Sequence, residues 1–288
     1  TLDNLLKDPE GNYYEWRFGK VFYVKQGSGA PILLVHDLTT QSSAFEWKKV
    51  ISDLSKTNTV YAIDLLGCGR SDKPSLTYTN YLYVQMITDF IKHIIGQKTD
   101  VIVTGESISA IIMTACNDKT IIKRIVMINP LDLNHLSLVP TKRTKFLKFV
   151  INTPIIGTTI YNLLSTRPSI EKLFFGDYFY DCSKIENNYI KTYYEAAHIR
   201  GEKSKYLFAS IKGRYTNANI VHCLKSLTNS IFILEGEGTP NNLVFAEQYK
   251  SILPSIEIVP LKKCKHLPQL EIPKEFLENV KIVFEIEE

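Results

Sequence analysis

The sequence of 288 residues has few cysteines and almost no excess of charge. Its five cysteines are odd in number and none forms a C-x-x-C pair, which argues against a disulfide framework and against a zinc site. The 34 basic and 30 acidic side chains give a formal net charge of only +4, so bulk charge predicts neither nucleic acid nor another polyanion as a partner. We therefore expect no metal, no cofactor and a cytoplasmic location. Because the chain begins at Thr1 rather than Met, the expected cytoplasmic location leaves open that a leader or membrane anchor preceded Thr1 and was removed.

Charged residues are also missing from one long stretch, residues 149–166, which is long enough to raise the question of a transmembrane helix. Asn152, Pro154 and Gly157 interrupt it, so we predict that it does not span a membrane. The preceding residues 142–149 alternate lysine and arginine with phenylalanine and leucine. This pattern predicts a solvated helix face, with contact to a membrane surface or an anionic lipid as the alternative.

Short apolar runs predict the strands of an α/β fold. They lie at residues 31–36, 58–63, 100–104, 124–128, 230–235 and 255–260, after a predicted hairpin of residues 13–17 and 21–25. Helical patterns separate the runs, as in residues 82–95, where Gly96 supplies the stop. Strands that alternate with helices predict a mainly parallel sheet with helices on both faces.

The most informative motif is the sequence VIVTGESISA at residues 101–110, in which a β-branched run ends in Gly105-Glu106-Ser107. A serine between small residues, at a sharp turn from a strand into a helix, is typical of a nucleophile elbow. The usual pattern is G-x-S-x-G, and here Ser109 replaces the last glycine. The motif predicts that the Ser107 hydroxyl is exposed above the sheet edge, the alternative being an ordinary turn.

Three further motifs accompany the elbow in a fixed order. His36 ends a predicted strand, a D-x-x-G-x-G-x-S segment occupies residues 64–71, and His266 comes shortly before an E-x-P segment at residues 271–273. Together with the elbow, these segments resemble the α/β-hydrolase superfamily from about residue 12 to residue 287. The resemblance implies a mostly parallel eight-stranded sheet formed by residues 1–130 and 215–288. It also implies a helical cap at residues 131–214, where the alternation of strands and helices breaks down.

The resemblance also implies a site. Ser107 would be the nucleophile and His266 the base, because a serine hydroxyl needs a base to take its proton near neutral pH. The backbone N–H groups of Leu38 and Ile108 would form the oxyanion hole.

The chain departs from the family pattern at two positions. Asp37 replaces the usual glycine after the histidine of the oxyanion loop, and an inward-pointing carboxylate there would oppose catalysis. Thr239 occupies the position of the triad acid, and threonine cannot supply a charge to stabilise an imidazolium. Asp132 is the first candidate to replace that acid, and Asn129 and Glu237 are the others.

These features predict a serine hydrolase acting on an ester, amide or carbon–carbon bond of a small apolar substrate. An aspartate nucleophile, as in the dehalogenases and epoxide hydrolases of this fold, is excluded on this interpretation by Ser107. The alternative is a weakly active or non-catalytic relative that binds a ligand or partner through the same pocket, because a fold does not fix a function.

Overall fold

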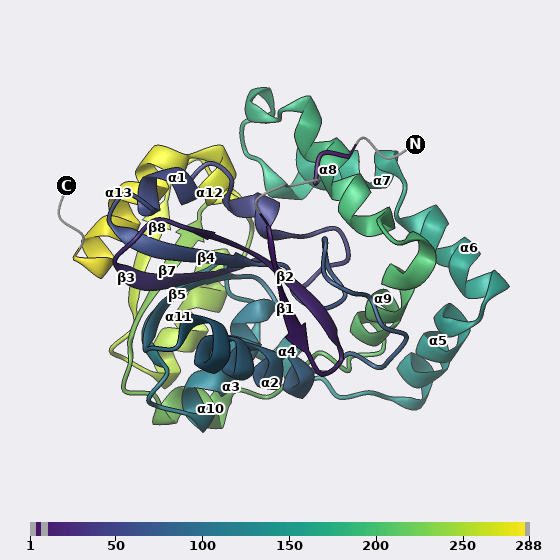
Figure 1. The fold of residues 1–288 in the computed structure, drawn as a ribbon, viewed down its shortest axis with the longest axis horizontal. Helices are drawn as coiled ribbons and strands as arrows, with labels where there is room; N and C mark the ends of the chain where they lie inside the picture. Colours follow the sequence, from purple (N-terminus) through teal and green to yellow (C-terminus); the bar gives the residue numbers. More distant parts are fainter. Residues whose placement is uncertain (1–3, 7–10, 286–288) are drawn as a thin grey trace.

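The computed structural model describes residues 4–6 and 11–285. Eight strands form one sheet in the order β1-β2-β4-β3-β5-β6-β7-β8 (Figure 1). The strands are β1 (Asn12–Trp16), β2 (Gly19–Gln26), β3 (Ala30–Val35), β4 (Asn58–Ile63), β5 (Thr99–Thr104), β6 (Ile122–Ile128), β7 (Ser230–Gly236) and β8 (Glu257–Leu261). Strands β3 to β8 are mutually parallel, whereas β2 is antiparallel to both β1 and β4. The predicted mostly parallel sheet and opening hairpin are confirmed.

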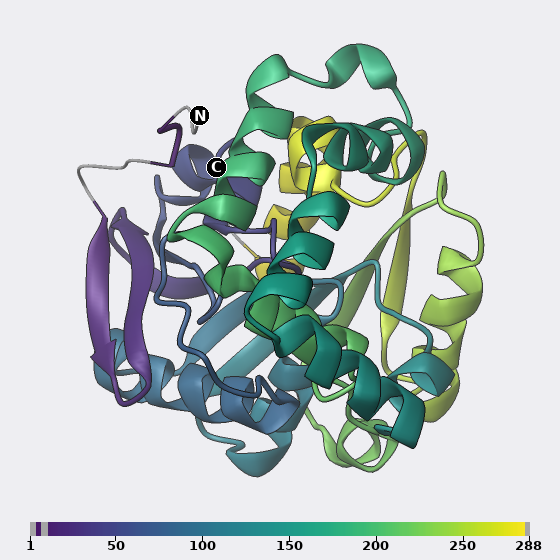
Figure 2. The ribbon, with the colours of Figure 1, turned by 90° about the vertical axis from the view of Figure 1, so that its right-hand side faces the viewer.

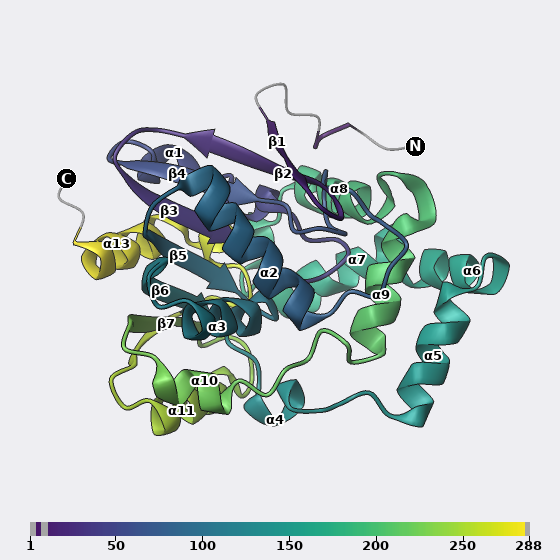
Figure 3. The ribbon, with the colours of Figure 1, turned by 60° about the horizontal axis from the view of Figure 1, so that its bottom comes forward.

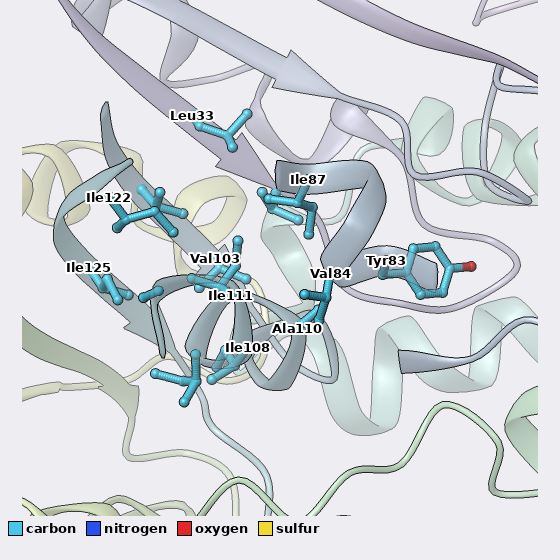
Figure 4. Close-up of a cluster of buried hydrophobic side chains, with 14 of the residues drawn as sticks. Leu33, Tyr83, Val84, Ile87, Val103, Ile108, Ala110, Ile111, Ile122 and Ile125 are labelled. Carbon is cyan, nitrogen blue, oxygen red and sulfur yellow. The ribbon is translucent and has the colours of Figure 1, made fainter. Parts of the chain in front are cut away.

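The central strands are apolar because both faces of the sheet are covered. All six residues of β5 are buried, and its register pairs Ile102 with Leu34 of β3 and with Val126 of β6. One face packs on α2 (Asn80–Phe90) and α3 (Ser107–Asn117), as Figure 4 shows. The same cluster includes residues of α10 (Val221–Ser226) and α11 (Asn242–Ile252). The other face packs on α1 (Ile51–Leu54) and α13 (Pro273–Phe284). Continuous apolar strands are what a parallel sheet buried on both faces requires.

The helix predicted at residues 82–95 is confirmed, with local signals at both ends. The Thr79 side chain accepts a hydrogen bond from the Leu82 amide and so caps the start of α2. The helix continues as a π-turn, Ile91–Ile95, and ends at Gly96, whose φ of 71° lies in the left-handed region.

Residues 131–214 are all described, and none of them lies in a strand. They form α4 (Leu133–Leu136), α5 (Lys142–Asn152), α6 (Ile155–Leu164), α7 (Arg167–Leu173), α8 (Asn187–His198) and α9 (Lys205–Lys212), with shorter helical turns between them. We call α5 to α9 the cap helices. They lie at the end of the molecule toward which the parallel strands point (Figures 1 and 2). The helical content expected of this segment is therefore present, while its status as a separate domain stays a prediction.

The aromatic residues of the cap pack onto the loop that contains His266. Phe174, Tyr178 and Tyr193 of the cap form one buried cluster with Leu267, next to His266, and with Leu270 of the short helix α12 (Pro268–Glu271). The uncharged stretch at residues 149–166 is divided between the end of α5 and α6. Among the described residues, no helix has the length and apolar character needed to cross a membrane.

Candidate active site

The sharp turn after β5 has Gly105 at its tip. Gly105 has a φ of +60°, and α3 begins two residues later at Ser107. A left-handed backbone favours glycine because glycine has no Cβ. The structure therefore corrects the prediction that Ser107 occupies the tip with an exposed hydroxyl. The Ser107 side chain is buried, and its hydroxyl donates a hydrogen bond of 2.6 Å to the carbonyl of His36.

The carboxylate of Asp37 fills the space where a nucleophile on this turn would project. A Cβ built on Gly105 would lie 2.1 Å from Asp37 Oδ1. That oxygen accepts hydrogen bonds of 2.8 Å from the amides of both Leu38 and Glu106. These are the amides that form the oxyanion hole in this type of site: one follows the tip residue and the other belongs to the loop after β3.

The second oxyanion-hole amide is therefore Glu106 rather than Ile108. The Ile108 amide donates to the carbonyl of Gly105 instead. The reason is the position of the turn: because Gly105 is the tip, the next amide along the chain belongs to Glu106. Of the two amides predicted from the sequence, Leu38 faces the carboxylate and Ile108 does not.

His266 lies beside the other oxygen of the same carboxylate. Its Nε2 is 3.0 Å from Asp37 Oδ2, and the ring of Tyr178 stacks on the imidazole with the centroids 5.0 Å apart. Within the described part of the chain, no hydrogen bond joins His266 to Ser107. The side chain predicted to be the base is thus paired with Asp37, which is only 6% exposed.

The electrostatics of this pair favour the charged forms of both partners. Burial raises the pKa of Asp37, but the hydrogen bond and charge of His266, with the amides of Glu106 and Leu38, outweigh burial and leave that pKa below its ordinary value. Burial likewise lowers the pKa of His266, but its hydrogen bond to Asp37, the charge of Asp37 and the charge of Glu46 together raise it. Both shifts stabilise the ion pair between the imidazolium and the carboxylate.

Two further carboxyl groups surround the pair and hold their protons to unusually high pH. Burial, followed by the charge of Asp37, raises the pKa of Glu46 to about 7 and that of Glu106 to about 8. Glu46 Oε1 accepts a hydrogen bond of 3.0 Å from the Tyr193 hydroxyl, and Oε2 accepts one from the Asp37 amide. Because pKa values perturbed by burial and by a specific charge gather at functional sites, this cluster is a candidate site.

None of the three candidates for the missing acid bonds the imidazole. Asp132 accepts a hydrogen bond of 3.0 Å from the Asn134 amide and so caps α4, which draws it away from the role predicted for it. Glu237 is exposed. The Thr239 hydroxyl oxygen is buried and has no hydrogen-bond partner among the described residues.

Asn129 holds the backbone of the histidine loop rather than its ring. Its Nδ2 donates to the carbonyls of Lys265 and His266, at 3.1 and 3.0 Å. Its Oδ1 accepts from the Gly236 amide at 2.8 Å and from the side chain of Asn242. One side chain at the end of β6 thus joins the end of β7 to the loop that carries His266.

His36 has the structural role that its place in the oxyanion loop predicts. Its Nε2 accepts a hydrogen bond of 3.0 Å from the Leu65 amide, so its Nδ1 carries the proton and donates to the carbonyl of Asp37. The ring fixes the backbone on which the Asp37 side chain stands.

A family model described as the alpha/beta hydrolase family matches residues 32–279. The chain belongs to the alpha/beta hydrolase family. It is 35% identical over 71 residues to a 2-hydroxy-6-oxo-6-(2'-aminophenyl)hexa-2,4-dienoic acid hydrolase of Metapseudomonas resinovorans, an alignment that covers 24% of each chain. It is also 28% identical over 110 residues to a soluble epoxide hydrolase of Corynebacterium sp. (strain C12), over 38% of each chain. The matched segments therefore span well under half the length of these relatives.

Solved structures agree with the family over nearly the whole chain. The structure of the epoxide hydrolase CorEH superposes with a TM-score of 0.76 over 96% of this chain and 98% of that one, at 19% sequence identity. At this identity the likeness concerns the fold. The α/β-hydrolase fold predicted from the sequence is confirmed.

In this α/β hydrolase, the side chain that fills the space at the tip of the turn does not belong to the tip residue. The tip residue usually carries the nucleophile, whereas here it is a glycine, and a carboxylate from the oxyanion loop takes the space. Sequence reasoning missed this exchange, and it also missed Glu46 and Tyr178. One local signal was present: Gly105 is the residue in this turn best suited to a left-handed backbone.

Proposed function

We propose that this α/β hydrolase opens and hydrolyses an epoxide, with Asp37 as the nucleophile and His266 as the base. The observation that carries the proposal is the position of the Asp37 carboxylate, which has one oxygen on two amides and the other facing an imidazole. Carboxylates are established nucleophiles in covalent catalysis. The matched segment of a soluble epoxide hydrolase supports the substrate class.

In the first step, Asp37 Oδ2 attacks a carbon of the epoxide ring and the bond from that carbon to the ring oxygen breaks. The product is a hydroxyalkyl ester on Asp37, once the released alkoxide has taken a proton. We assign the supply of that proton to the phenol of Tyr178, whose ring stacks on His266. Burial raises the pKa of Tyr178 well above its ordinary value, so the phenol is intact when the substrate arrives.

In the second step, the ester is hydrolysed. The ester carries no charge, so the influence of Asp37 that raises the pKa of His266 is lost and the imidazolium returns a proton to the phenolate. The neutral imidazole then removes a proton from water, whose oxygen adds to Cγ of Asp37. The amides of Leu38 and Glu106 stabilise the oxyanion at Oδ1. Its collapse breaks the ester bond, and the leaving alkoxide takes the proton of the imidazolium to give the diol. The carboxylic acid left on Asp37 then returns a proton to His266, which restores the carboxylate and the imidazolium.

Glu46 would supply part of the negative charge that Thr239, at the position of the triad acid, cannot supply. Its pKa of about 7 is raised partly by the charge of Asp37, so esterification of Asp37 favours ionisation of Glu46. A carboxylate formed there stabilises the imidazolium during ester hydrolysis. We therefore assign Glu46 a positioning and electrostatic role, acting through His266.

The test follows oxygen atoms. Turnover of styrene oxide in ¹⁸O-water should place ¹⁸O in the carboxylate of Asp37, which peptide mass spectrometry detects. His266→Gln should accumulate the ester on Asp37, and Asp37→Asn should produce no diol. Diol formation without label at Asp37, or no diol at all, would contradict the proposal.

A serine hydrolase acting through Ser107 is the form of hydrolase predicted from the sequence. The match to a relative named as a dienoic acid hydrolase supports it. It requires Ser107 to leave its hydrogen bond with the His36 carbonyl and to become exposed. Covalent labelling of Ser107 by a fluorophosphonate would favour this mechanism over the aspartate one.

A non-catalytic binding protein is the second candidate, favoured by one observation. Asp37 already engages both oxyanion-hole amides and is 6% exposed, so the carboxylate also closes the hole to a substrate oxyanion. A chain that forms neither ester nor diol from any epoxide in a panel, while remaining folded, would favour this function.

A further inference from the structure

We propose that α5 and α6, at the outer end of the cap, dock on a membrane surface that contains anionic lipid. The two helices form a hairpin around Thr153 and Pro154, which we call the cap hairpin. Figures 1 and 3 both place it at the edge of the molecule furthest from the sheet. The proposal is independent of the chemistry at Asp37.

Exposed apolar side chains are concentrated in and just before this hairpin. Eighteen large apolar side chains of the described residues are exposed, and nine of them lie between residues 138 and 164. The most exposed of these nine are Ile155 at 81%, Val139 at 70%, Phe146 and Leu163 at 68%, and Phe149 at 67%. Single exposed apolar residues are ordinary, but a contiguous group indicates an interaction surface.

The charge of the same segment has one sign. The chain has 30 acidic residues, yet none lies between residues 133 and 170. Helix α5 carries four cations, and Lys142, Arg143 and Lys145 are all exposed. Apolar side chains that enter a bilayer, next to lysine and arginine that meet lipid phosphates, are typical of a helix lying in the membrane interface.

The apolar residues are exposed on a rigid support rather than on a loose loop. Lys205 of α9 is buried and donates hydrogen bonds to the carbonyl of Thr153 and the hydroxyl of Thr158, at 3.2 and 2.8 Å. Gly157 allows close approach of the helices, because a Cβ there would lie 1.9 Å from the carbonyl oxygen of Ile151. Tyr161 and Ile151 fill the inner side. The outer side chains therefore face outward in the folded protein.

The charge also decides between a membrane and a second copy of the chain. In a symmetric dimer through this face, the cations of one α5 would meet those of the other, and like charges repel. An anionic bilayer offers both an apolar interior and negative headgroups. The contact that we propose is a peripheral one, made by the surface of α5 and α6.

Vesicle flotation of the full chain tests the proposal. The protein should bind vesicles of equal parts phosphatidylcholine and phosphatidylglycerol. Its binding to pure phosphatidylcholine vesicles, or to the mixed vesicles in about 1 M salt, should be at least about tenfold weaker. Lys142→Glu with Lys145→Glu should lower binding to the mixed vesicles by at least about tenfold. Phe146→Ser with Phe149→Ser should lower binding to both kinds of vesicle.

Matched variants elsewhere provide the controls. Lys119→Glu with Lys123→Glu changes the net charge by the same amount, at exposed positions outside the cap. Leu243→Ser with Val244→Ser removes comparably exposed apolar side chains from α11. Both should change binding less than about twofold. The proposal is overturned if the vesicles are not bound, if the control variants lose as much binding, or if sedimentation shows a dimer that Phe146→Ser with Phe149→Ser dissociates without any effect on vesicles.

Discussion

At the scale of single residues, the decisive feature is that Gly105 and Asp37 share one space. A side chain at position 105 and the carboxylate at position 37 exclude each other, because a Cβ on Gly105 would lie 2.1 Å from Asp37 Oδ1. The carboxylate of Asp37 thus occupies the space into which the tip residue of this turn usually projects a nucleophile. The two positions are expected to be coupled energetically.

The coupling gives a first prediction. Gly105→Ser alone should lower the free energy of unfolding by roughly 2–4 kcal/mol, through strain at a left-handed φ and through overpacking. In combination with Asp37→Gly, the overpacking part should disappear, and urea unfolding measures both variants. The double variant should also gain hydrolysis of p-nitrophenyl acetate, because a serine hydroxyl then lies beside His266 and two free amides.

Gly96→Ser is the matched control, since Gly96 also has a left-handed φ but nothing lies within 4 Å of an added Cβ. It should show only the backbone cost of a left-handed φ, about 1–2 kcal/mol. Simple additivity of the substitutions at positions 37 and 105 would contradict the shared space.

Ser107 gives a second prediction. Ser107→Ala removes one buried hydrogen bond to the His36 carbonyl and should cost about 1 kcal/mol of stability. Diol formation from styrene oxide should change by less than about threefold, because Ser107 does not touch the reacting carboxylate. A fluorophosphonate should leave the unsubstituted chain unlabelled. A loss of about 10³-fold or more in activity would instead place Ser107 in the chemistry.

At the scale of elements, the site depends on how the carboxyl ends of β3, β5, β6 and β7 meet the histidine loop. The register of the sheet brings these ends to one edge, but backbone pairing alone does not hold the loop. Asn129 supplies that link, with a φ of 49° that asparagine tolerates better than most residues. Its amide group bonds both β7 and the loop.

A third prediction follows for Asn129. Asn129→Ala leaves several buried backbone groups without partners and should cost roughly 2–4 kcal/mol in urea unfolding, with loss of turnover as His266 shifts. Asn129→Asp keeps the acceptor toward Gly236 but loses both donors to the histidine loop. It should therefore reduce turnover more than Asn242→Ala, which removes a neighbouring amide that does not bond the loop. Equal turnover in the Asp variant and the unsubstituted chain would rule out this positioning role.

At the scale of the whole molecule, buried titratable groups make stability depend on pH. The folded chain holds the Glu106 proton to about pH 8, whereas the unfolded chain releases it near pH 4.5, so stability falls as pH rises between these values. His266 acts in the same direction: its stabilisation is complete below an unfolded pKa of about 6.5 and is lost as pH rises through the higher folded pKa. Buried His36, whose pKa is lowered, acts in the opposite direction only below about pH 6.5.

The fourth prediction concerns the part of the pH dependence that Glu106 supplies: between pH 7 and pH 9 this group should lower the free energy of unfolding by about 1 kcal/mol, while buried Lys73, whose pKa is lowered to about 8, acts in the opposite direction. Urea unfolding at several pH values measures it. Glu106→Gln should remove this decrease, so that the difference in stability between the unsubstituted chain and the variant changes by about 1 kcal/mol from pH 7 to pH 9, and Glu237→Gln at an exposed position should not change it. The same pH dependence in the unsubstituted chain and in Glu106→Gln would show that Glu106 is not held as the structure indicates.

Local sequence patterns were enough to predict the fold. Apolar runs of strand length, helical periodicity and stop signals such as Gly96 act over a few residues, so the order of strands and helices can be predicted from local patterns. The family motifs then placed His36, His266 and the strand-to-helix turn in one fold. The helical nature of residues 131–214 followed from the same patterns.

The groups that meet at the site could not be predicted in the same way, because they come from distant parts of the chain. Asp37 and His266 lie 229 residues apart, and the direction in which the Asp37 carboxylate points depends on the amides of Leu38 and Glu106. Likewise, a local motif could not decide between Gly105 and Ser107 for the tip, because the answer depends on which residue takes the left-handed backbone when β5 joins α3. Side-chain direction and backbone strain are set by contacts between distant segments, and a local sequence pattern does not contain them.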